Sequence, residues 1–217
     1  MESVPRKYSM EIRSEEAALR RQRLIDATVE VLGEVGADRL TMDMVARRAD
    51  TATRTVYNHF PTRQDLLAAV YADLLQTNRE TVRLEVVETG EPAERLRQFV
   101  ALVCDIYDRQ GAVITTFIEL DEPVIRAQVR DMRAWRRDSI EQILRPADGT
   151  LRLPLQQAVA FAFVLTTPQS WRSLREELGL TQQEAIETIA TGLDAGLFGA
   201  SATPTTHPSN HAQPGGQ

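Results

Sequence analysis

Apolar residues recur at helical spacing along most of the chain. The first stripe, which lies on one face of a helix, consists of Leu24, Ala27, Thr28, Val31, Leu32 and Val35. Similar stripes follow through Leu66–Leu74, Leu96–Tyr107, Ile114–Leu120 and Ile186–Leu197. No alternating strand pattern and no internal repeat stands out. The pattern therefore predicts an all-α chain.

Capping residues divide the front of the chain into short helices. Gly36 is a C-cap candidate for the first stripe, and Thr41 is a good N-cap for a short second helix. The pattern breaks at 49–52, and a third helix is expected from about Thr53 to His59. Thr62 then caps a fourth helix, with Asp65 placed favourably for its dipole. Short helices separated by a tight turn are typical of a helix-turn-helix.

The rear of the chain is expected to form longer helices. Pro92 starts one, Gly111 separates it from the next, and Pro123 starts a charged helix that reaches Leu144. A further long helix is predicted over Leu155–Leu178, and a capping box at Thr181 and Glu184 opens the last one.

Composition excludes several classes of protein. With 217 residues, 42% hydrophobic and 26% charged, the chain has the balance of an ordinary soluble protein of one or two domains. The apolar run Ala158–Leu165 is far shorter than the ~18 residues of a membrane helix, and no signal peptide is recognisable. A cytoplasmic location without membrane contact is expected.

Catalytic and metal chemistry have little support in the sequence. Cys104 is the one cysteine and is interpreted as a core residue, while His59 is the one histidine outside the C-terminal tail. Motifs for a serine nucleophile, a dinucleotide or a P-loop are absent. We therefore expect no enzyme activity, no cofactor and no metal site.

Charge is distributed unevenly. The chain carries a net charge of −6, but residues 39–63 contain five arginines and two aspartates. From residue 76 onward there are 14 basic and 19 acidic residues. This split favours a front part that faces nucleic acid. Arg47 and Arg48 are interpreted as solvent-facing, and a DNA contact through Arg20, Arg21 and Arg23 stays open. The stretch with Arg133, Arg136 and Arg137 is interpreted as a solvated helix face in preference to a second basic patch.

The short third helix has the properties of a DNA-reading helix. Val56 and Phe60 are placed to pack inward, while Thr53, Arg54, Tyr57 and Asn58 point outward. An arginine offers two donors to guanine in the major groove, and threonine contacts base edges or thymine methyls.

Residues 23–75 resemble the tetracycline-repressor (TetR) family of bacterial transcription regulators. The resemblance is carried by Leu24–Thr28, Gly36, Leu40-Thr41, Val45-Ala46, Ala49 and above all the run from Thr55 to Leu67. It implies that Thr53, Arg54, Thr55 and Asn58 reach bases or nearby backbone. It also implies phosphate contacts for Tyr57, His59, Arg63 and Thr41.

The turn departs from the family pattern. Asp50-Thr51-Ala52 stand where the family usually has Gly-Val-Ser. Asp tolerates the left-handed conformation less well than Gly, and Ala52 cannot cap, which leaves Thr51 or Thr53 as the cap. Asp43 and Asp50 could also repel phosphate. These departures motivate an alternative, a helical small-molecule carrier or enzyme with a vestigial DNA-binding module.

The rear helices are expected to pair two copies of the chain and to hold an effector. Leu155–Leu178 and Thr181–Phe198 are apolar enough to form a four-helix bundle with a twofold mate, approaching closely at Ala158 and Ala162. A mainly apolar pocket is expected, and Asp121 and Glu122 are open as contacts to a cationic ligand or as caps. The expected pocket residues are Phe99, Val103, Tyr107, Phe117, Trp135 and Phe161.

The predicted organisation has four parts. They are a flexible arm (1–19), a helix-turn-helix domain (20–66), a helical effector-binding and dimerisation domain (67–198) and a disordered tail (199–217). We expect a homodimeric repressor that binds a near-palindromic operator and is released by an unidentified small molecule.

Overall fold

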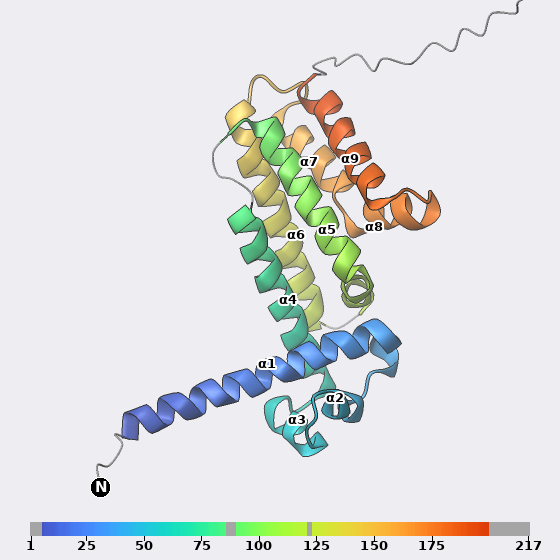
Figure 1. Cartoon of the computed structure of the whole chain (residues 1–217). Helices are drawn as coiled ribbons and strands as arrows, with labels where there is room; N and C mark the ends of the chain where they lie inside the picture. Colours follow the sequence, from blue (N-terminus) through green and yellow to red (C-terminus); the bar gives the residue numbers. More distant parts are fainter. Residues whose placement is uncertain (1–5, 86–89, 121–122, 200–217) are drawn as a thin grey trace, which may run out of the picture.

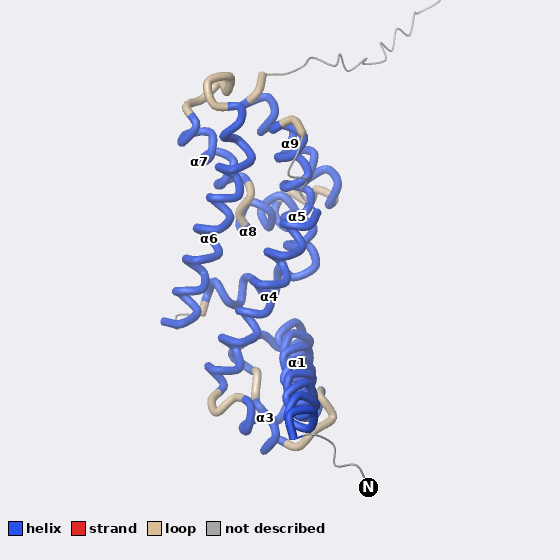
Figure 2. Tube along the Cα trace, turned by 90° about the vertical axis from the view of Figure 1, so that its left-hand side faces the viewer, coloured by secondary structure: helices blue, strands red, loops and turns tan. Residues whose placement is uncertain are grey.

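The computed structural model describes residues 6–85, 90–120 and 123–199. Within these ranges every regular element is a helix, which confirms the all-α prediction (Figure 1, Figure 2). The helices are α1 (Arg6–Arg39), α2 (Met42–Arg48), α3 (Thr53–His59), α4 (Arg63–Glu85), α5 (Pro92–Glu119), α6 (Pro123–Leu144), α7 (Leu155–Leu165), α8 (Pro168–Arg172) and α9 (Gln182–Leu197). A 3-10 turn (Arg145–Ala147) follows α6, and a π-helical turn (Ser173–Glu177) follows α8.

The front helices enclose their own core. The predicted stripe of α1 is buried from Leu24 to Leu32, with Val35 half-buried. It packs against Val45 of α2, Val56 of α3 and Leu66 of α4, which are fully buried. Figure 1 shows α2 and α3 tucked below α1, whose N-terminal half extends beyond them.

The predicted caps are confirmed. Thr41 Oγ1 accepts a hydrogen bond from Met44 N at 3.3 Å and begins α2. Thr62 and Asp65 cap α4 reciprocally, because Asp65 N donates to Thr62 Oγ1 at 3.1 Å and Thr62 N donates to Asp65 Oδ2 at 3.0 Å. Gly36 has a φ of 73° and makes the kink at which the main part of α1 stops.

Two expectations, about the start of α1 and about a break within α5, are wrong. Residues 6–19, assigned to a flexible arm, continue α1, since Glu15 to Leu19 are mostly good helix formers and Glu16 pairs with Arg20 one turn on. Gly111 does not separate two helices, because α5 runs unbroken from Pro92 to Glu119. The expected disordered tail lies outside the described residues from 200 onward, as do Asp121 and Glu122.

The long helix expected over Leu155–Leu178 is broken. It stops at Leu165 and restarts at Pro168, where Thr167 Oγ1 accepts from Ser170 N at 3.0 Å. A proline has no N–H to continue the helical ladder, and its ring disfavours helical conformation in the residue before it. The small residues Ala158 and Ala162 are fully buried within the chain, so they cannot face a partner as expected.

The rear helices enclose a second core, and α4, α5 and α6 link it to the first. Phe99 and Ile140 belong to the rear core, whereas Phe117 of α5 and Ile125 of α6 are buried in the front core. Each of these three helices therefore contributes side chains to both cores. None of the described helices combines the length and the apolar content that crossing a bilayer requires.

Candidate nucleic-acid interface and rear cavity

The turn between α2 and α3 is a complete Schellman motif. Thr51 N donates to Ala46 O at 2.9 Å and Asp50 N donates to Arg47 O at 3.3 Å. Asp50 occupies the left-handed position of the motif with a φ of 49°. The chain therefore makes with aspartate the turn that glycine makes most easily.

The orientation predicted for α3 is confirmed. Val56 and Phe60 are buried, Arg54, Tyr57 and Asn58 are exposed, and Thr53, Thr55 and His59 are half-buried. The inward residues fix the helix on the front core, while Arg54 at its N-terminus and Tyr57 and Asn58 further along stay open to solvent. That arrangement is the one that a reading helix needs in order to enter a major groove.

Neither Thr51 nor Thr53 caps α3. The N-cap position is Ala52, which forms no side-chain hydrogen bond. Thr53 Oγ1 instead donates to Asp43 Oδ1 of α2 at 3.0 Å, and Arg47 pairs with the other oxygen of Asp43 at 3.1 Å. The charge of Asp43 is thereby partly compensated, which weakens the repulsion of phosphate expected from it.

The arginines of the front module differ in how far partners within the chain occupy their guanidinium groups. Arg48 is bound by Glu30 at 2.8 Å and Glu34 at 2.7 Å, which raise its pKa. Arg63, expected on phosphate, donates to Leu40 O at 3.2 Å and to Ala37 O, so it fastens α4 to the end of α1. Arg54 has no side-chain partner among the described residues and lies exposed at the start of α3.

A shallow hollow lies beside the reading helix. Its volume is about 170 Å³, and its lining includes Arg20 and Arg23 of α1 together with Thr51 and Thr55. Arg20 and Arg23 therefore lie next to the turn, where a backbone phosphate could reach guanidinium groups and hydroxyls but would also meet the carboxylate of Asp50, which lines the same hollow. Thr41 lies exposed at the N-terminus of α2.

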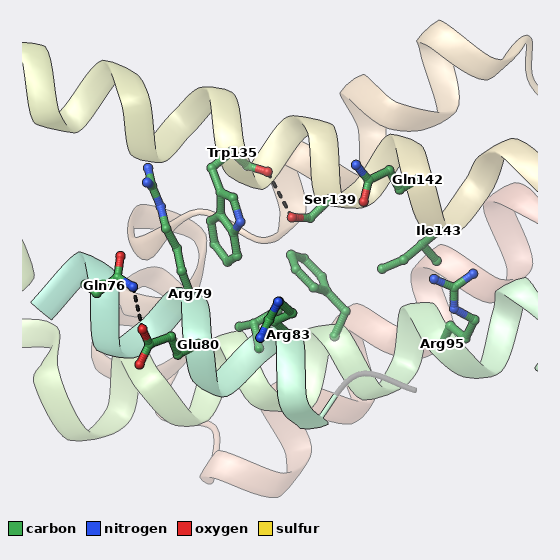
Figure 3. A pocket seen from close by; sticks show the side chains of 11 residues that line it. Gln76, Arg79, Glu80, Arg83, Arg95, Trp135, Ser139, Gln142 and Ile143 are labelled. Atoms are coloured by element: carbon green, nitrogen blue, oxygen red, sulfur yellow. Dashed lines mark hydrogen bonds between the residues drawn. The ribbon is translucent and has the colours of Figure 1, made fainter. Parts of the chain in front are cut away.

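Two adjoining hollows lie between α4, α5 and α6 in the rear domain. The outer groove has a volume of about 510 Å³ and a polar rim that includes Arg83, Arg95 and Gln142 (Figure 3). The inner cavity has a volume of about 50 Å³. Arg79, Val82 and Trp135 line both, so these side chains form the partition between them.

The expected pocket residues divide into two groups. Val103, Tyr107 and Trp135 line the inner cavity, and Phe99 lines the outer groove with Trp135. Phe117 is outside both, because it is buried in the front core with its ring centroid 4.8 Å from that of Tyr71. Phe161 lies half-exposed on α7, away from the cavity.

Sequence reasoning missed four polar residues of the cavity wall, namely Tyr71, Asn78, Arg79 and Arg136. Arg136 is buried, although the charged stretch around it was interpreted as a solvated face. Its Nη1 donates to Tyr107 Oη at 2.8 Å and to Thr166 O at 3.1 Å. Burial raises the pKa of Tyr107 and that of Tyr71, the latter to about 12, so both phenols keep their protons at neutral pH.

The described residues contain no cluster of three or more potential metal ligands. Cys104 is buried in the rear core, as interpreted from the sequence, and burial raises the pKa of its thiol to about 12.

Comparisons with known proteins agree with this geometry. Residues 24–70 match the family described as "Bacterial regulatory proteins, tetR family". The chain is 35% identical over 85 residues to the HTH-type transcriptional regulator BetI of Escherichia coli O139:H28, an overlap of 38% of this chain and 44% of BetI. The chain thus spans less than half the length of the curated relatives that it matches.

Solved structures extend the similarity to both domains. A transcriptional regulator from Rhodococcus sp. Rha1 superposes with a TM-score of 0.72 at 18% identity, over 85% of this chain and 99% of that one. The fatty acid degradation regulator FadR from Bacillus halodurans superposes with a TM-score of 0.68 at 17% identity, over 82% and 95%. FadR from Bacillus subtilis, solved with stearoyl-CoA, gives a TM-score of 0.62 at 16% identity over 82% and 98%. At these identities the likeness establishes the fold.

Proposed function

This chain belongs to the tetR family of bacterial regulatory proteins, and we propose that it is a dimeric, sequence-specific DNA-binding repressor released by a small molecule. The observation that carries the proposal is the geometry of α3. An unpaired Arg54 is exposed at its N-terminus and Tyr57 and Asn58 are exposed further along, while Val56 and Phe60 anchor the opposite face in the core. We further propose that the protein is not catalytic and acts in the cytoplasm, where its DNA lies.

The proposed DNA contacts follow the resemblance. Thr53, Arg54, Thr55 and Asn58 contact bases or the adjacent backbone, and Tyr57 and His59 contact phosphate. Two residues act from the flanking helix starts, Thr41 at α2 and Arg63 at α4. Since Arg63 also donates to Ala37 O of α1 and to Leu40 O just after that helix, a phosphate there meets a guanidinium whose position is already fixed.

A dimer is proposed through α7 and α9. Exposed residues on α7 occur at the spacing of one helix face, and so do exposed small residues on α9: Gln157, Ala160, Phe161 and Val164, and Thr188, Thr191, Gly192 and Ala195. The two helices are neighbours, since a Cβ on Gly196 of α9 would lie 2.7 Å from the Phe161 ring. Pairing these faces across a twofold axis would place two α3 helices on a near-palindrome, about one DNA turn or ~34–36 Å apart.

Release is proposed to act through α4. This helix begins at Arg63, which donates to Ala37 O of α1, and about two turns further its Tyr71 lines the inner cavity. A ligand that moves α4 relative to α6 changes the separation of the two α3 helices. A coupling free energy of about 1–3 kcal/mol corresponds to a 5–150-fold change in DNA affinity.

The test is binding to the DNA upstream of the protein's own gene. Fluorescence anisotropy between about 50 and 200 mM salt should show a steep loss of affinity as counterions compete. A small-molecule carrier with a vestigial DNA module would show no such slope, and that result would overturn the proposal.

Arg54 provides the residue-level prediction. Arg54→Ala should weaken operator binding by about 1–3 kcal/mol and relax the preference at one base pair, if the guanidinium reads guanine. The matched control is Arg109→Ala, which removes an exposed arginine paired with Asp105 on α5, outside the front module. An equal loss on all DNA sequences would assign Arg54 to phosphate, and an equal loss in both variants would remove its special role.

A further inference from the structure

Arg136 is a buried cation without a counter-charge. Its side chain is on α6, only 2% exposed, at the wall of the inner cavity. The groups that touch it are the hydroxyl of Tyr107, the carbonyl of Thr166 and the ring of Phe163, whose centroid is 4.2 Å from Cζ. All three are neutral, and no carboxylate within the described ranges forms an ion pair with this guanidinium.

This arrangement is energetically unusual. Removing a guanidinium from water costs several kcal/mol, and buried charges in proteins are normally paired. Nη1 is satisfied by two acceptors, but Nε is buried and has no hydrogen-bond partner. A charged donor group with a buried, unpaired N–H has the chemistry of an anion-binding site.

Two more unpaired donors line the same cavity from α4. The Tyr71 hydroxyl and Arg79 Nε are both buried without hydrogen-bond partners. Tyr71 is 2% exposed, and its raised pKa keeps the hydroxyl protonated and able to donate. Arg79, Arg133 and Arg136 are close enough that their positive charges act on this phenol, so the potential around it is positive. The unpaired polar groups thus match a single anionic head group.

The rest of the wall selects an apolar body. Between these donors the inner cavity is lined largely by aliphatic and sulfur-containing side chains from α4, α5 and α6: Leu74, Leu75, Val103, Ile106, Ile114 and Met132. At about 50 Å³ the inner cavity alone holds only a few water molecules. A larger ligand must extend past the partition formed by Arg79 and Trp135, which contact each other with Cζ 5.8 Å from the ring centroid (Figure 3). The outer groove beyond is too polar to favour a long alkyl chain.

We propose that the inner cavity binds a compact apolar carboxylic acid as its anion, with the carboxylate on Arg136 and Tyr71. A body of about six to ten carbon atoms then fits between α4, α5 and α6 by displacing the Arg79–Trp135 partition toward the outer groove. The inference rests on the proposed function, because it assigns the chemical class of the effector. Binding to these two residues would also connect the ligand to both ends of the molecule. Tyr71 belongs to α4, which reaches the DNA-binding module, and Arg136 holds Thr166 O at the end of α7, on the proposed dimer side.

The experiment measures ligand binding to the full chain without DNA. Isothermal titration calorimetry and thermal shift compare 3-phenylpropionate, benzoate, hexanoate and octanoate with the primary amide of each. At least one acid should bind ten-fold or more tightly than its amide, which has the same shape and no charge.

Variants then locate the carboxylate. Tyr71→Phe removes a hydroxyl that has no partner, so the protein should fold normally and lose about ten-fold in affinity for the acid but not for the amide. Arg136→Gln should abolish the preference for the acid. The matched control is Arg137→Gln on the same helix, an exposed arginine paired with Asp138 at 2.8 Å, which should bind as the wild type does.

Three results overturn the proposal: no acid distinguished from its amide, Tyr71→Phe unchanged in acid affinity, or Arg137→Gln as damaging as Arg136→Gln. If Arg136→Gln does not fold, Tyr71→Phe decides alone. Because the titration contains no DNA, its failure leaves the proposed DNA binding intact. Conversely, acid binding without any operator binding would remove the regulator and retain the ligand site.

Discussion

Asp50 is the residue on which the reading turn depends. It holds a φ of 49°, where glycine is stable and other residues pay a steric penalty that is smallest for Asp and Asn. Asp50→Gly should therefore raise the free energy of unfolding by about 0.5–1 kcal/mol, despite the greater freedom of glycine in the unfolded chain. Thermal unfolding of the DNA-free protein measures this effect.

Asparagine at the same position separates backbone strain from charge. Asp50→Asn keeps a residue that tolerates the left-handed region and removes the negative charge beside the DNA-facing surface. Its melting temperature should stay near that of the wild type, whereas operator affinity should rise in both variants. A melting temperature raised equally by asparagine would show that charge, and not backbone conformation, limits the stability of the turn.

Cys104 should be chemically silent in the folded protein. Burial raises the pKa of its thiol to about 12, so at pH 8 only about one molecule in ten thousand carries a thiolate. Ellman's reagent should react at pH 8 only after denaturation. The unfolded thiol ionises at lower pH than the folded one, so this group contributes stability below pH ~9 that is lost as the pH rises toward 12. Rapid labelling of native protein would contradict the burial of the side chain.

Residue-scale prediction succeeded where the relevant partners are close in sequence. The inward positions of Val56 and Phe60 follow from helical spacing within α3, and the caps at Thr41 and Thr62 follow from three-residue motifs. Arg136 could not be separated from Arg133 and Arg137, because burial depends on the phase of α6 relative to α5. The partner of Thr53 was equally hidden, since Asp43 lies ten positions away on another helix.

At the scale of elements, glycine and proline differ in how strongly they end a helix. Gly111 costs a helix only about 1 kcal/mol relative to alanine, and burial of Ile114 and Phe117 outweighs that cost, so α5 continues. Pro168 removes a hydrogen-bond donor and clashes with the preceding turn, a penalty of ~3 kcal/mol, and the helix stops. Both residues are candidate helix breakers in the sequence, but the packing of their neighbours decides which of them ends a helix.

Two helical glycines provide an opposed pair of variants. A Cβ on Gly111 would meet no atom within 4 Å, so Gly111→Ala should stabilise the protein by about 1 kcal/mol and raise its melting temperature by about 2–4 °C. A Cβ on Gly196 would lie 2.7 Å from the ring of Phe161. Gly196→Ala should therefore destabilise the protein by about 1–3 kcal/mol, as overpacking does. Calorimetry of the two variants compares them directly, and two shifts of the same sign would refute the packing described for α7 and α9.

At the scale of the whole molecule, the front and rear parts have separate hydrophobic cores, and α4, α5 and α6 contribute side chains to both. Phe117 and Ile125 lie on rear helices but are buried with the front module, and Tyr71 lies in contact with Phe117 while it also lines the inner cavity. The front core therefore does not end at the boundary predicted near residue 66, because residues from later helices are buried in it. Rear helices that are buried in the front core are the physical basis for coupling a ligand to α3.

Assembly is the remaining property at this scale, and Val164 tests it. Its side chain is 60% exposed on the α7 face proposed for the dimer, where it adjoins the exposed residues Ala160 and Phe161. Val164→Glu would place a carboxylate in that interface on both copies. The variant should sediment as a monomer under conditions in which the wild type is a dimer, and its affinity for a full operator should fall to that for a half-site.

Val124→Glu is the matched control, because Val124 is 59% exposed at the start of α6, outside the α7 and α9 faces. The same substitution there should leave both the oligomeric state and operator binding unchanged. The dimer through α7 and α9 would be refuted by a Val164→Glu variant that still sediments as a dimer. It would also be refuted if both variants dissociated alike, because the effect would then follow added charge and not the position of the face. The separation of the two α3 helices depends on that face, so the outcome also decides whether DNA recognition requires two copies.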